Sequence, residues 1–427
     1  MLKILNIGID ISLKEAVISL LTWEGKYLGE SFKIPNNLPG AGELENRLSS
    51  VLSTGTFEHV RFGMEATQNY GFHLAEKLAS SDKLSAWKPL VYMINAKYIK
   101  DFKGAFPEKD KTDLIDSKFI AEYLRFGKLP HPFEANNRYL PLQRLVRCRY
   151  HLVKNIERET KFFLANLFLK FPGWVQRRPI KTLGKSAMDV LHEFYSLDEI
   201  VQMPLEELAL FVAKAGKNRS PNPEKIAEEI KKAAHESYRL RADLANSVQF
   251  ILETIIVNIR ALKSSLKEVN RAIEKEMRGF SNPLLSVRGI GPVYAAGLLA
   301  CIGNTKRFST HNQIAKLAGL VWKRNQSGKF EAEERRLIRQ ADRYLRYYLV
   351  EAANSLRVYN EEYSRYYQKK YWEVNKHQHK RALVLTARKL VRLVFALLSK
   401  NQLYEPARAF QCAQPSLTLS CKSKSRR

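Results

Sequence analysis

The chain begins with the stretch Leu2–Ile11, LKILNIGIDI, which is apolar and β-branched except near its end, where Asp10 stands. A short apolar run of this composition predicts a buried β-strand. An ionised carboxylate at the end of such a strand is costly unless a cation or hydrogen-bond donors compensate it. Asp10 is therefore a candidate functional residue, although a single Asp at a strand end is more often a turn or cap residue.

The residues that follow predict an α/β domain that begins with a three-stranded meander, since Glu24-Gly25 is a turn signal between two apolar runs. Strand and helix patterns then alternate in the order β-β-β-α-β-α-β-α. We expect strands at Leu2–Ile11, Glu15–Trp23, Tyr27–Ile34, His59–Met64 and Leu90–Ile94, helices at Gly42–Leu52, Tyr70–Ser80 and Lys111–Phe126, and a polar loop with Gly104 and Pro107 before the last helix. This order is the layout of the ribonuclease H-like fold.

From Leu140 onward the pattern predicts an almost entirely helical chain. Leu140–Leu169 predicts a long amphipathic helix that ends at Phe171-Pro172-Gly173, and residues 174–220 predict short helices and loops. Apolar residues spaced by three and four then predict a long helix or coiled coil between Leu244 and Met277. An intrachain helical hairpin and an oligomer contact explain this stripe equally well.

The chain has 427 residues, of which 45% are hydrophobic, and a formal net charge of +28. This composition excludes wholesale disorder, and no apolar run approaches the roughly 20 residues that a membrane-spanning helix needs. The four scattered cysteines lack the spacing of a disulfide scaffold or a zinc site, which favours a reducing, cytoplasmic compartment. So large a positive charge calls for a polyanionic partner, either nucleic acid or an anionic membrane.

The charge is unevenly distributed along the chain. Residues 1–130 hold 17 Lys and Arg against 16 Asp and Glu, a net +1, so the remainder carries +27. This contrast indicates one part with carboxylate chemistry and another that grips phosphates. We expect a metal-binding domain at 1–130, a helical linker and coiled-coil region at 138–280, a helical domain at 281–405 and a basic, disordered tail at 406–427.

Three further carboxylates accompany Asp10 in the first domain. Glu65 follows the fourth expected strand in GMEATQNYG, and Asp113 and Asp116 in KTDLID share one face of a helix. In a ribonuclease H-like fold the ends of strands one and four are neighbours and the third helix packs beside them, so the four side chains would converge. Such a group suits two divalent ions, Mg²⁺ or Mn²⁺, that flank a scissile phosphate. Taken alone, a helical Asp pair is more often a solvated face.

Two stretches of the C-terminal domain predict phosphate contacts. Gly289-Ile290-Gly291, within the apolar stretch Leu284–Gly303, resembles a helix-hairpin-helix whose glycine N–H groups form a nest for a phosphate, with a tight interhelical turn as the alternative. Residues 319–346 interleave aromatic side chains with cations, which is typical of a surface that grips a nucleic-acid backbone. These cations are Lys323, Arg324, Lys329, Arg335, Arg336, Arg339, Arg343 and Arg346. Ser327 lies among them, and its residue type alone indicates a solvated loop serine.

In combination these motifs resemble the DEDD transposases of insertion sequences, the group that includes the pilin-gene invertase and the bridge-RNA-guided recombinases. NIGIDIS, GMEAT, KTDLID, GIGPVYAAGLLACIG and the SG of KRNQSGK occur in the family's order, and the similarity spans roughly residues 3–405. The resemblance implies that Asp10, Glu65, Asp113 and Asp116 are the metal-binding tetrad of a RuvC-like domain. It also implies that Ser327 is the nucleophile of a C-terminal transposase domain.

The resemblance further implies a transposase or site-specific recombinase that cuts and rejoins DNA. A structured non-coding bridge RNA would pair with donor and target DNA, and a homo-oligomer, a dimer or tetramer, would combine the tetrad of one subunit with the serine of another. The expected location is the cytoplasm of a prokaryotic cell, with association with the nucleoid during action. A membrane partner is excluded, because the basic stretches accompany phosphate-handling motifs rather than an exposed apolar face.

The sequence departs from the family pattern at a few positions. Ser117 stands where a small Ala is expected, Asp342 stands where Gly is usual and beside phosphate would lower affinity locally, and residues 406–427 have no counterpart. Two other interpretations compete with the recombinase. One is a RuvC-like structure-specific endonuclease, or junction resolvase, in which Ser327 is incidental. The other is a nucleic-acid-binding protein without chemistry.

Overall fold

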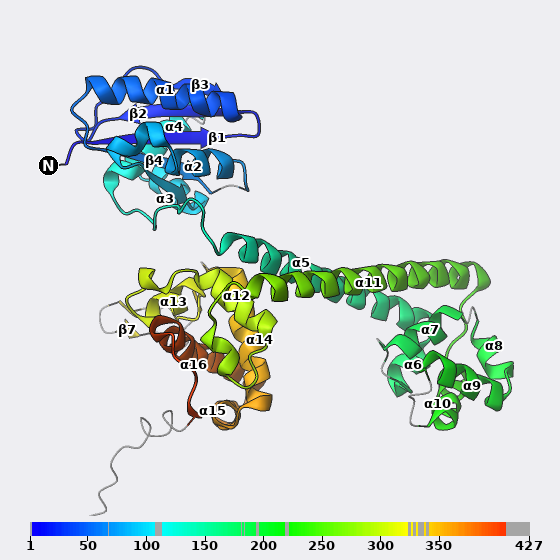
Figure 1. Cartoon of the computed structure of the whole chain (residues 1–427). Helices are drawn as coiled ribbons and strands as arrows, with labels where there is room; N and C mark the ends of the chain where they lie inside the picture. Colours follow the sequence, from blue (N-terminus) through cyan, green and yellow to red (C-terminus); the bar gives the residue numbers. More distant parts are fainter. Residues whose placement is uncertain are drawn as a thin grey trace, which may run out of the picture. The chain divides into compact units, whose positions relative to one another are not determined.

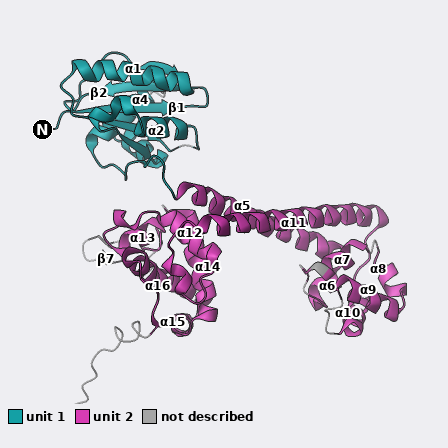
Figure 2. Ribbon diagram, viewed as in Figure 1, with its two compact units in different colours: residues 1–138 teal, residues 139–427 magenta. Residues whose placement is uncertain are grey.

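The computed structural model describes residues 2–66, 68–106, 113–180, 182, 184–193, 196–217, 222–322, 326–327, 330–331, 337–338 and 341–406. The chain divides into two compact units, Met1–Arg138 (unit 1) and Tyr139–Arg427 (unit 2), which are coloured separately in Figure 2. Unit 1 is α/β and unit 2 is mostly helical, as the sequence predicts for the fold class (Figure 1). Within the described ranges, no helix is long and apolar enough to cross a membrane.

Unit 1 is built on a five-stranded sheet in the order β3-β2-β1-β4-β5. Strand β1 pairs antiparallel with β2 and parallel with β4, and β4 pairs parallel with β5. The strands are β1 Ile4–Ile11, β2 Glu15–Leu21, β3 Phe32–Pro35, β4 His59–Glu65 and β5 Leu90–Ile94. This is the strand order that the ribonuclease H-like interpretation requires.

Helices cover both faces of this sheet. Leu5, Ile7 and Ile9 of β1 belong to an apolar core with residues of α1 and α2, whereas α4 packs on β1, β2 and β4 from the other side. Because side chains alternate along a strand, Gly8 and Asp10 belong to the α4 face. The helices of unit 1 are α1 Leu38–Thr54, α2 Phe72–Ala79, the 3₁₀ helix η1 Asp82–Trp87, α3 Ala96–Lys103 and α4 Asp113–Phe126.

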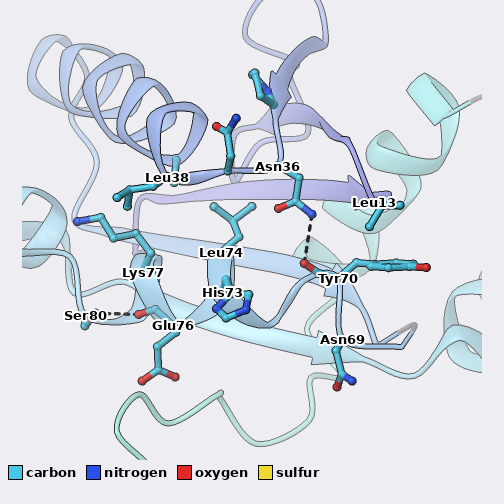
Figure 3. Close-up of a pocket in the computed structure, with 13 residues that line it drawn as sticks. Leu13, Asn36, Leu38, Asn69, Tyr70, His73, Leu74, Glu76, Lys77 and Ser80 are labelled. Carbon is cyan, nitrogen blue, oxygen red and sulfur yellow. Dashed lines mark hydrogen bonds between the residues drawn. The ribbon is translucent and has the colours of Figure 1, made fainter.

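A cavity of about 730 Å³ opens where α1 and α2 meet the loops that follow β1 and β4. Tyr70, His73 and Leu74 line it together with Leu38, as Figure 3 shows. The Asn36 side-chain amide donates to the carbonyl of Ser12 at 2.9 Å and to that of Tyr70 at 3.3 Å, so it ties the two loops together. The cavity is thus lined from the α1 and α2 side of the sheet.

Two expectations for unit 1 were wrong in detail. The third strand, expected at Tyr27–Ile34, begins only at Phe32, and Tyr27 forms an isolated bridge with Leu21. Gly29, with φ +70°, interrupts the extended conformation between them. The loop expected after β5 contains helix α3, which Asn95 caps by accepting the N–H of Lys97 at 2.9 Å.

Two long helices, α5 Leu140–Lys170 and α11 Ala242–Met277, pack along each other in unit 2 (Figure 1). They run antiparallel, because Arg149 Nε donates to Asn270 Oδ1 at 2.9 Å while Lys170 near the other end contacts Gln249. The apolar stripe of α11 is buried at Val248, Ile255, Ile259, Ile273 and Met277. These contacts therefore bury the stripe within one chain, as the intrachain hairpin explanation predicts.

An apolar core lies at each end of this hairpin. The first core contains residues of α6 Pro172–Arg177, α7 Lys185–Glu193, α8 Leu197–Gln202, α9 Leu205–Ala215 and α10 Pro223–His235. The elements around the second core are the 3₁₀ helices η2 Pro283–Ser286 and η3 Thr305–Arg307, α12 Pro292–Ile302, α13 His311–Leu317, the short strands β6 Gln326–Ser327 and β7 Phe330–Glu331, α14 Arg343–Tyr359, α15 Glu361–Trp372 and α16 Gln378–Lys400.

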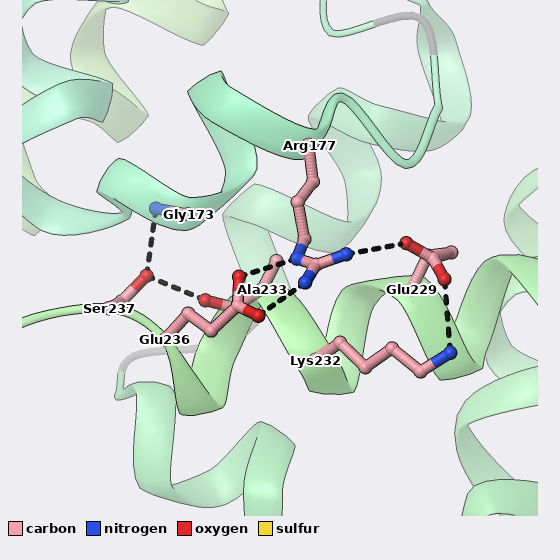
Figure 4. Close-up of polar contacts among 7 residues, drawn as sticks. All are labelled: Gly173, Arg177, Glu229, Lys232, Ala233, Glu236 and Ser237. Atoms are coloured by element: carbon pink, nitrogen blue, oxygen red, sulfur yellow. Dashed lines mark hydrogen bonds and ion pairs between the residues drawn. The ribbon is translucent and has the colours of Figure 1, made fainter.

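Helix α6 touches the backbone of the end of α10. A Cβ on Gly173 would lie 2.2 Å from the carbonyl oxygen of Ala233, and the Gly173 N–H donates to Ser237 Oγ at 2.9 Å. Arg177 adds ion pairs to Glu229 and Glu236, which Figure 4 shows beside that contact. Because surface ion pairs contribute little, the close backbone approach at Gly173 determines how the two helices meet.

We predict that Gly8→Ala destabilises unit 1 by about 3 kcal/mol, since an added Cβ would lie 1.9 Å from the carbonyl oxygen of Ser117. Gly42→Ala is the matched control: it lies inside α1 with no atom within 4 Å of the new Cβ, and is expected to stabilise by up to about 1 kcal/mol. Urea denaturation measures the free energy of unfolding of each variant, and hydrogen exchange of the amides in β1 and α4 measures the local effect. Equal stabilities of the two variants would contradict the prediction.

Candidate active site

Asp10 and Glu65 lie at the same edge of the sheet on neighbouring parallel strands. The pairing of β1 with β4 runs as far as Ile9 opposite Met64, and the two acidic residues are the next residues on each strand. Both carboxylates are half-buried. Glu65 is the last residue of β4, rather than the residue after it as the sequence had suggested. The expected meeting of these two strand ends is therefore observed.

Two glycines explain why α4 lies against this part of the sheet. A Cβ on Gly8 would lie 1.9 Å from the carbonyl oxygen of Ser117, and one on Gly63 would lie 2.8 Å from Ile120 Cγ2. Both glycines precede an acidic residue by two positions, so Asp10 and Glu65 face the same side as α4. The helix thus packs directly on the strand backbone next to the two carboxylates.

The direction of α4 brings its first turn toward the same edge. Ser117 Oγ lies 2.7 Å from Ser19 Oγ, and Ser19 pairs with Gly8 in the middle of β1. Further along α4, Arg125 lies against Gly25, in the turn after β2 and hence beside the start of β1. Helix α4 therefore runs antiparallel to β1, and Asp113 and Asp116 belong to the end that points toward Asp10. Ser117, a departure from the family pattern, is fully buried in this contact.

Asp116 forms an ion pair with Lys103, the last residue of α3. Both side chains are mostly buried, with 21% and 27% of their surfaces exposed. The side chain of Asp113 is outside the described part of the chain. Among the residues that the structure describes, no group of three or more His, Cys, Asp or Glu residues lies close enough to share a metal ion.

The donor chemistry of this edge nevertheless fits a divalent metal. Carboxylate oxygens are the ligands that Mg²⁺ prefers, and Asp10 and Glu65 supply them at this edge. Asp116 belongs to the end of α4 that points toward the same edge, without lying close enough to both to share an ion with them in this structure. Asp116 already holds a cation, the ammonium group of Lys103. A metal ion that bound Asp116 would have to displace that ammonium group. Asp10 and Glu65 face α4, whereas the cavity of Figure 3 opens on the opposite face of the sheet and lacks both.

The glycine motif of unit 2 differs from a pair of helices joined by a turn. One 3₁₀ turn, η2, precedes it, and α12 begins after Gly291. Gly289 has φ +106°, and a Cβ there would lie 3.3 Å from the Cα of Leu356 in α14. Close packing against α14 therefore explains this glycine. The expected contacts of Gly289 and Gly291 with phosphate remain predictions.

Ser327 belongs to the strand pair β6–β7, in which it lies opposite Phe330. Its side chain is outside the described part of the chain. Six of the predicted nucleic-acid-binding cations also lie outside the described residues: Lys323, Arg324, Lys329, Arg335, Arg336 and Arg339.

Arg343 and Arg346, the two predicted cations that are described, differ in their surroundings. Arg343 is exposed and stacks on Tyr344, with its Cζ 4.9 Å from the ring centroid. Its hydrogen bond to the Tyr344 hydroxyl raises the pKa of Arg343 further above its usual range. Arg346 instead donates hydrogen bonds to main-chain carbonyls, which sequence reasoning did not foresee.

Arg343 and Arg346 both border a cavity of about 330 Å³ between α5 and α14, whose lining also includes Tyr150, Lys154, Tyr347 and Glu351. Burial raises the pKa of Glu351 and of Tyr347. Lys154 Nζ lies 5.6 Å from the Tyr347 ring centroid. Cations and aromatic rings thus alternate around this cavity, which is a pattern suited to stacked bases and their phosphates.

Asp342, the second departure from the family pattern, caps α14. Its carboxylate accepts the N–H groups of Tyr344 at 2.8 Å and Leu345 at 2.9 Å. An acidic residue at a helix N-terminus satisfies otherwise unpaired donors and interacts favourably with the helix dipole. The structure therefore gives this acidic residue a local role in folding.

Two family models match the chain. One, described as a transposase, matches residues 7–172, and the other, described as the transposase IS116/IS110/IS902 family, matches residues 281–368. The first match includes all four candidate carboxylates, and the second includes Gly289, Gly291 and Ser327. Both matches fall on the segments that carry the candidate chemistry.

Several known proteins are similar to the chain. The insertion element IS900 uncharacterized 42 kDa protein of Mycobacterium paratuberculosis is 23% identical over 76% of this chain and 80% of its own length. The insertion element IS116 uncharacterized 44.8 kDa protein of Streptomyces clavuligerus is 23% identical over 74% and 78%. A probable family 20 transposase of Pseudomonas aeruginosa is 28% identical over 36% and 47%.

One solved structure, T. thermophilus RuvC in complex with Holliday junction substrate, aligns with 31% of this chain and all of its own. The TM-score is 0.23 and the sequence identity 16%. The assignment of the sheet therefore rests on its own strand order.

We predict that Lys103→Met tightens binding of Mn²⁺ about fivefold, measured by calorimetry on the protein without DNA. Removal of one positive charge beside a cation site is worth about 1 kcal/mol at short range. Lys100→Met is the control, because Lys100 is exposed and lies one turn earlier on α3. If the two variants bound Mn²⁺ equally, Asp116 would not belong to the metal site.

Proposed function

Since this chain belongs to the IS116/IS110/IS902 family of transposases, we propose that it cuts and rejoins DNA with Ser327 as nucleophile and a metal-binding group of carboxylates. The two family models together match more than half of its residues. As a transposase it acts on DNA. The observation that carries the proposal is that Asp10 and Glu65 follow the last paired residues of two neighbouring parallel strands, at the edge toward which the acidic first turn of α4 points.

The proposed metal ligands are Asp10, Glu65, Asp113 and Asp116. Mg²⁺ or Mn²⁺ held by these carboxylates would act as a Lewis acid that offsets negative charge on the reacting phosphate. Support for this ligand set comes from the backbone, since two of the residues belong to neighbouring strands and two to a helix that packs on them. Lys103 would balance the charge of Asp116 whenever no metal is bound there.

Ser327 would attack the phosphorus of a DNA phosphodiester through its hydroxyl oxygen, with loss of the hydroxyl proton. The bond from phosphorus to the leaving sugar oxygen breaks, and that oxygen takes up a proton. One phosphodiester is exchanged for another, so the bond energy is kept in a serine–phosphate link. The hydroxyl of a second strand can then attack this link, rejoin the DNA and release Ser327. Water takes no part, which distinguishes this reaction from hydrolysis.

The proposal includes a structured non-coding guide RNA and a homo-oligomer, either a dimer or a tetramer. The +27 charge after residue 130 supports contact with more nucleic acid than a single duplex backbone requires. A protein that holds paired guide RNA would read A-form shape and backbone rather than sequence. Asp10 lies in unit 1 and Ser327 in unit 2, so two copies could each supply one half of an active site.

We predict that the protein, incubated with its substrate DNA and Mg²⁺, forms a protein–DNA adduct that survives denaturation. Ser327→Ala should abolish the adduct, because the nucleophilic oxygen is absent, while DNA binding persists. Asp10→Asn should also abolish it. Ser281→Ala is the control, since Ser281 is an exposed serine of the same unit that donates to Asn401. Denaturing gel electrophoresis with labelled DNA measures the adduct.

Two outcomes would favour the competing interpretations. Cleavage that survives Ser327→Ala but is lost in Asp10→Asn indicates a RuvC-like endonuclease in which water attacks. DNA binding by the wild-type protein with neither adduct nor cleavage indicates a binding protein without chemistry.

We also predict that RNA which copurifies with the protein is one discrete structured species. Sequencing of the bound RNA tests this, with the same preparation washed at high salt as the control for loosely bound RNA. A heterogeneous sample of cellular RNA would contradict guided targeting and would leave the proposed serine chemistry unaffected.

A further inference from the structure

We propose that Arg346 is a positioning residue, which holds both ends of the segment that carries Ser327, and that position 346 acts through this contact rather than through a phosphate. This inference rests on the proposed function, in which Ser327 is the nucleophile. It also reassigns a cation that the sequence placed in the nucleic-acid-binding surface.

The hydrogen bonds of Arg346 span the segment. Nε donates to the carbonyl of Ala318 at 2.9 Å, and Nη2 donates to the carbonyls of Gly319 at 3.1 Å and Ile338 at 2.8 Å. Ala318 and Gly319 precede Ser327 in the chain, and Ile338 follows it. One guanidinium group therefore joins the two ends of the segment 319–338.

Helix α14 gives this guanidinium group a rigid base. Leu345, Tyr348 and Leu349 flank Arg346 on the helix and are fully buried in the core of unit 2. The Tyr348 hydroxyl donates to the carbonyl of Val146 in α5 at 2.7 Å. Because the helix is fixed on the core, the guanidinium group is fixed in position relative to the core as well.

Backbone contacts reinforce the same closure. The N–H of Ile338 donates to the carbonyl of Val321 at 3.0 Å, and Trp322 forms an antiparallel bridge with Leu337. The N–H of Asp342 donates to the carbonyl of Leu317 at 2.8 Å. These three backbone contacts therefore hold the two ends of the segment together in addition to the hydrogen bonds of Arg346.

Gly319 is matched to Arg346. It has φ +64°, a conformation that L side chains rarely adopt, and an added Cβ would lie 2.0 Å from Arg346 Nη2. The guanidinium group therefore lies where any side chain at position 319 would have to be. This fit requires glycine at 319 and a flat, forked cation at 346.

An ammonium group could not replace this arrangement. Arg presents five N–H donors in a rigid plane, whereas Lys presents a single charged point on a flexible stem. Three of these donors, on Nε and Nη2, are directed to carbonyls of the protein, and the side chain also borders the cavity between α5 and α14. Position 346 therefore contributes the geometry of its hydrogen bonds rather than its charge. If the segment shifted and displaced Ser327 by about 1 Å, the reaction could slow roughly 100-fold.

The test compares Arg346→Lys and Arg346→Met with Arg343→Met, an exposed arginine three residues earlier on the same helix. Adduct formation is followed in a single turnover at saturating DNA, and DNA affinity is measured over a range of salt concentrations. Both Arg346 variants are expected to slow adduct formation at least about tenfold, with unchanged affinity and salt dependence. Arg343→Met is expected to weaken binding and to reduce the salt slope by about one phosphate contact.

Hydrogen exchange provides a readout that does not depend on activity. In both Arg346 variants the amides of Ile338 and Asp342 should exchange faster, whereas in Arg343→Met they should not. Gly319→Ala, which displaces the guanidinium group while keeping Arg346, should give the same exchange and rate pattern, and serves where an Arg346 variant fails to fold.

Two results would overturn the inference. Full activity in Arg346→Lys with loss in Arg346→Met would show that charge matters at this position, and a reduced salt slope in Arg346→Met would show a phosphate contact. A wild-type protein that forms no adduct would overturn the proposed function instead, and unchanged exchange in the Arg346 variants would separately overturn the closure of the segment.

Discussion

Helix α4 packs closely on β1 and β4, because the α4 backbone approaches β1 at Gly8 and the α4 side chains Ile120 and Leu124 pack against β4 at Gly63. This close approach fixes the height of the helix above the sheet. It also fixes its direction, since Ser117 lies over Gly8 while Arg125 lies against Gly25. A larger residue at either glycine would move the acidic first turn of α4 away from the edge where Asp10 and Glu65 lie. The proposed chemistry of unit 1 therefore depends on two positions that carry no functional group.

The described part of unit 2 is built mainly from helices, with one short strand pair, β6–β7. The antiparallel pair α5 and α11 buries the apolar stripe that would otherwise be exposed, and each end of the pair enters an apolar core. The core with α12 and α14 includes residues of α5 and α11, among them Val146 and Ile273. The element that carries the proposed nucleophile is therefore anchored to the helical hairpin through α14.

Elements that are determined by neighbouring residues were predictable from the sequence, whereas contacts between distant residues were predictable only in part. Strand β5 was predicted to the residue, because it is a short apolar run between polar segments. Helix α5 was predicted from its true start at Leu140 to one residue before its end at Lys170, because Phe171-Pro172-Gly173 stops the helix. Helix α3 was missed, since it has eight residues and its start signal, Asn95, lies in what reads as a polar loop. The meeting of Asp10 with Glu65 was predictable from strand ends. The pairing of Asp116 with Lys103 was not, because Lys103 belongs to the helix that was missed.

The two arginines of α14 show why the number of basic residues in a stretch can exceed the number of phosphates that the stretch contacts. Arg343 and Arg346 have the same residue type, helix and local charge, so no sequence pattern separates them. Their partners do: Arg343 stacks on an aromatic ring at the surface, whereas Arg346 donates to carbonyls up to 28 residues away in the chain. Three of the five N–H donors of Arg346 are engaged with carbonyls, so this side chain has fewer donors left for a phosphate. Part of the +28 charge therefore organises the protein itself, and only the rest is available to nucleic acid.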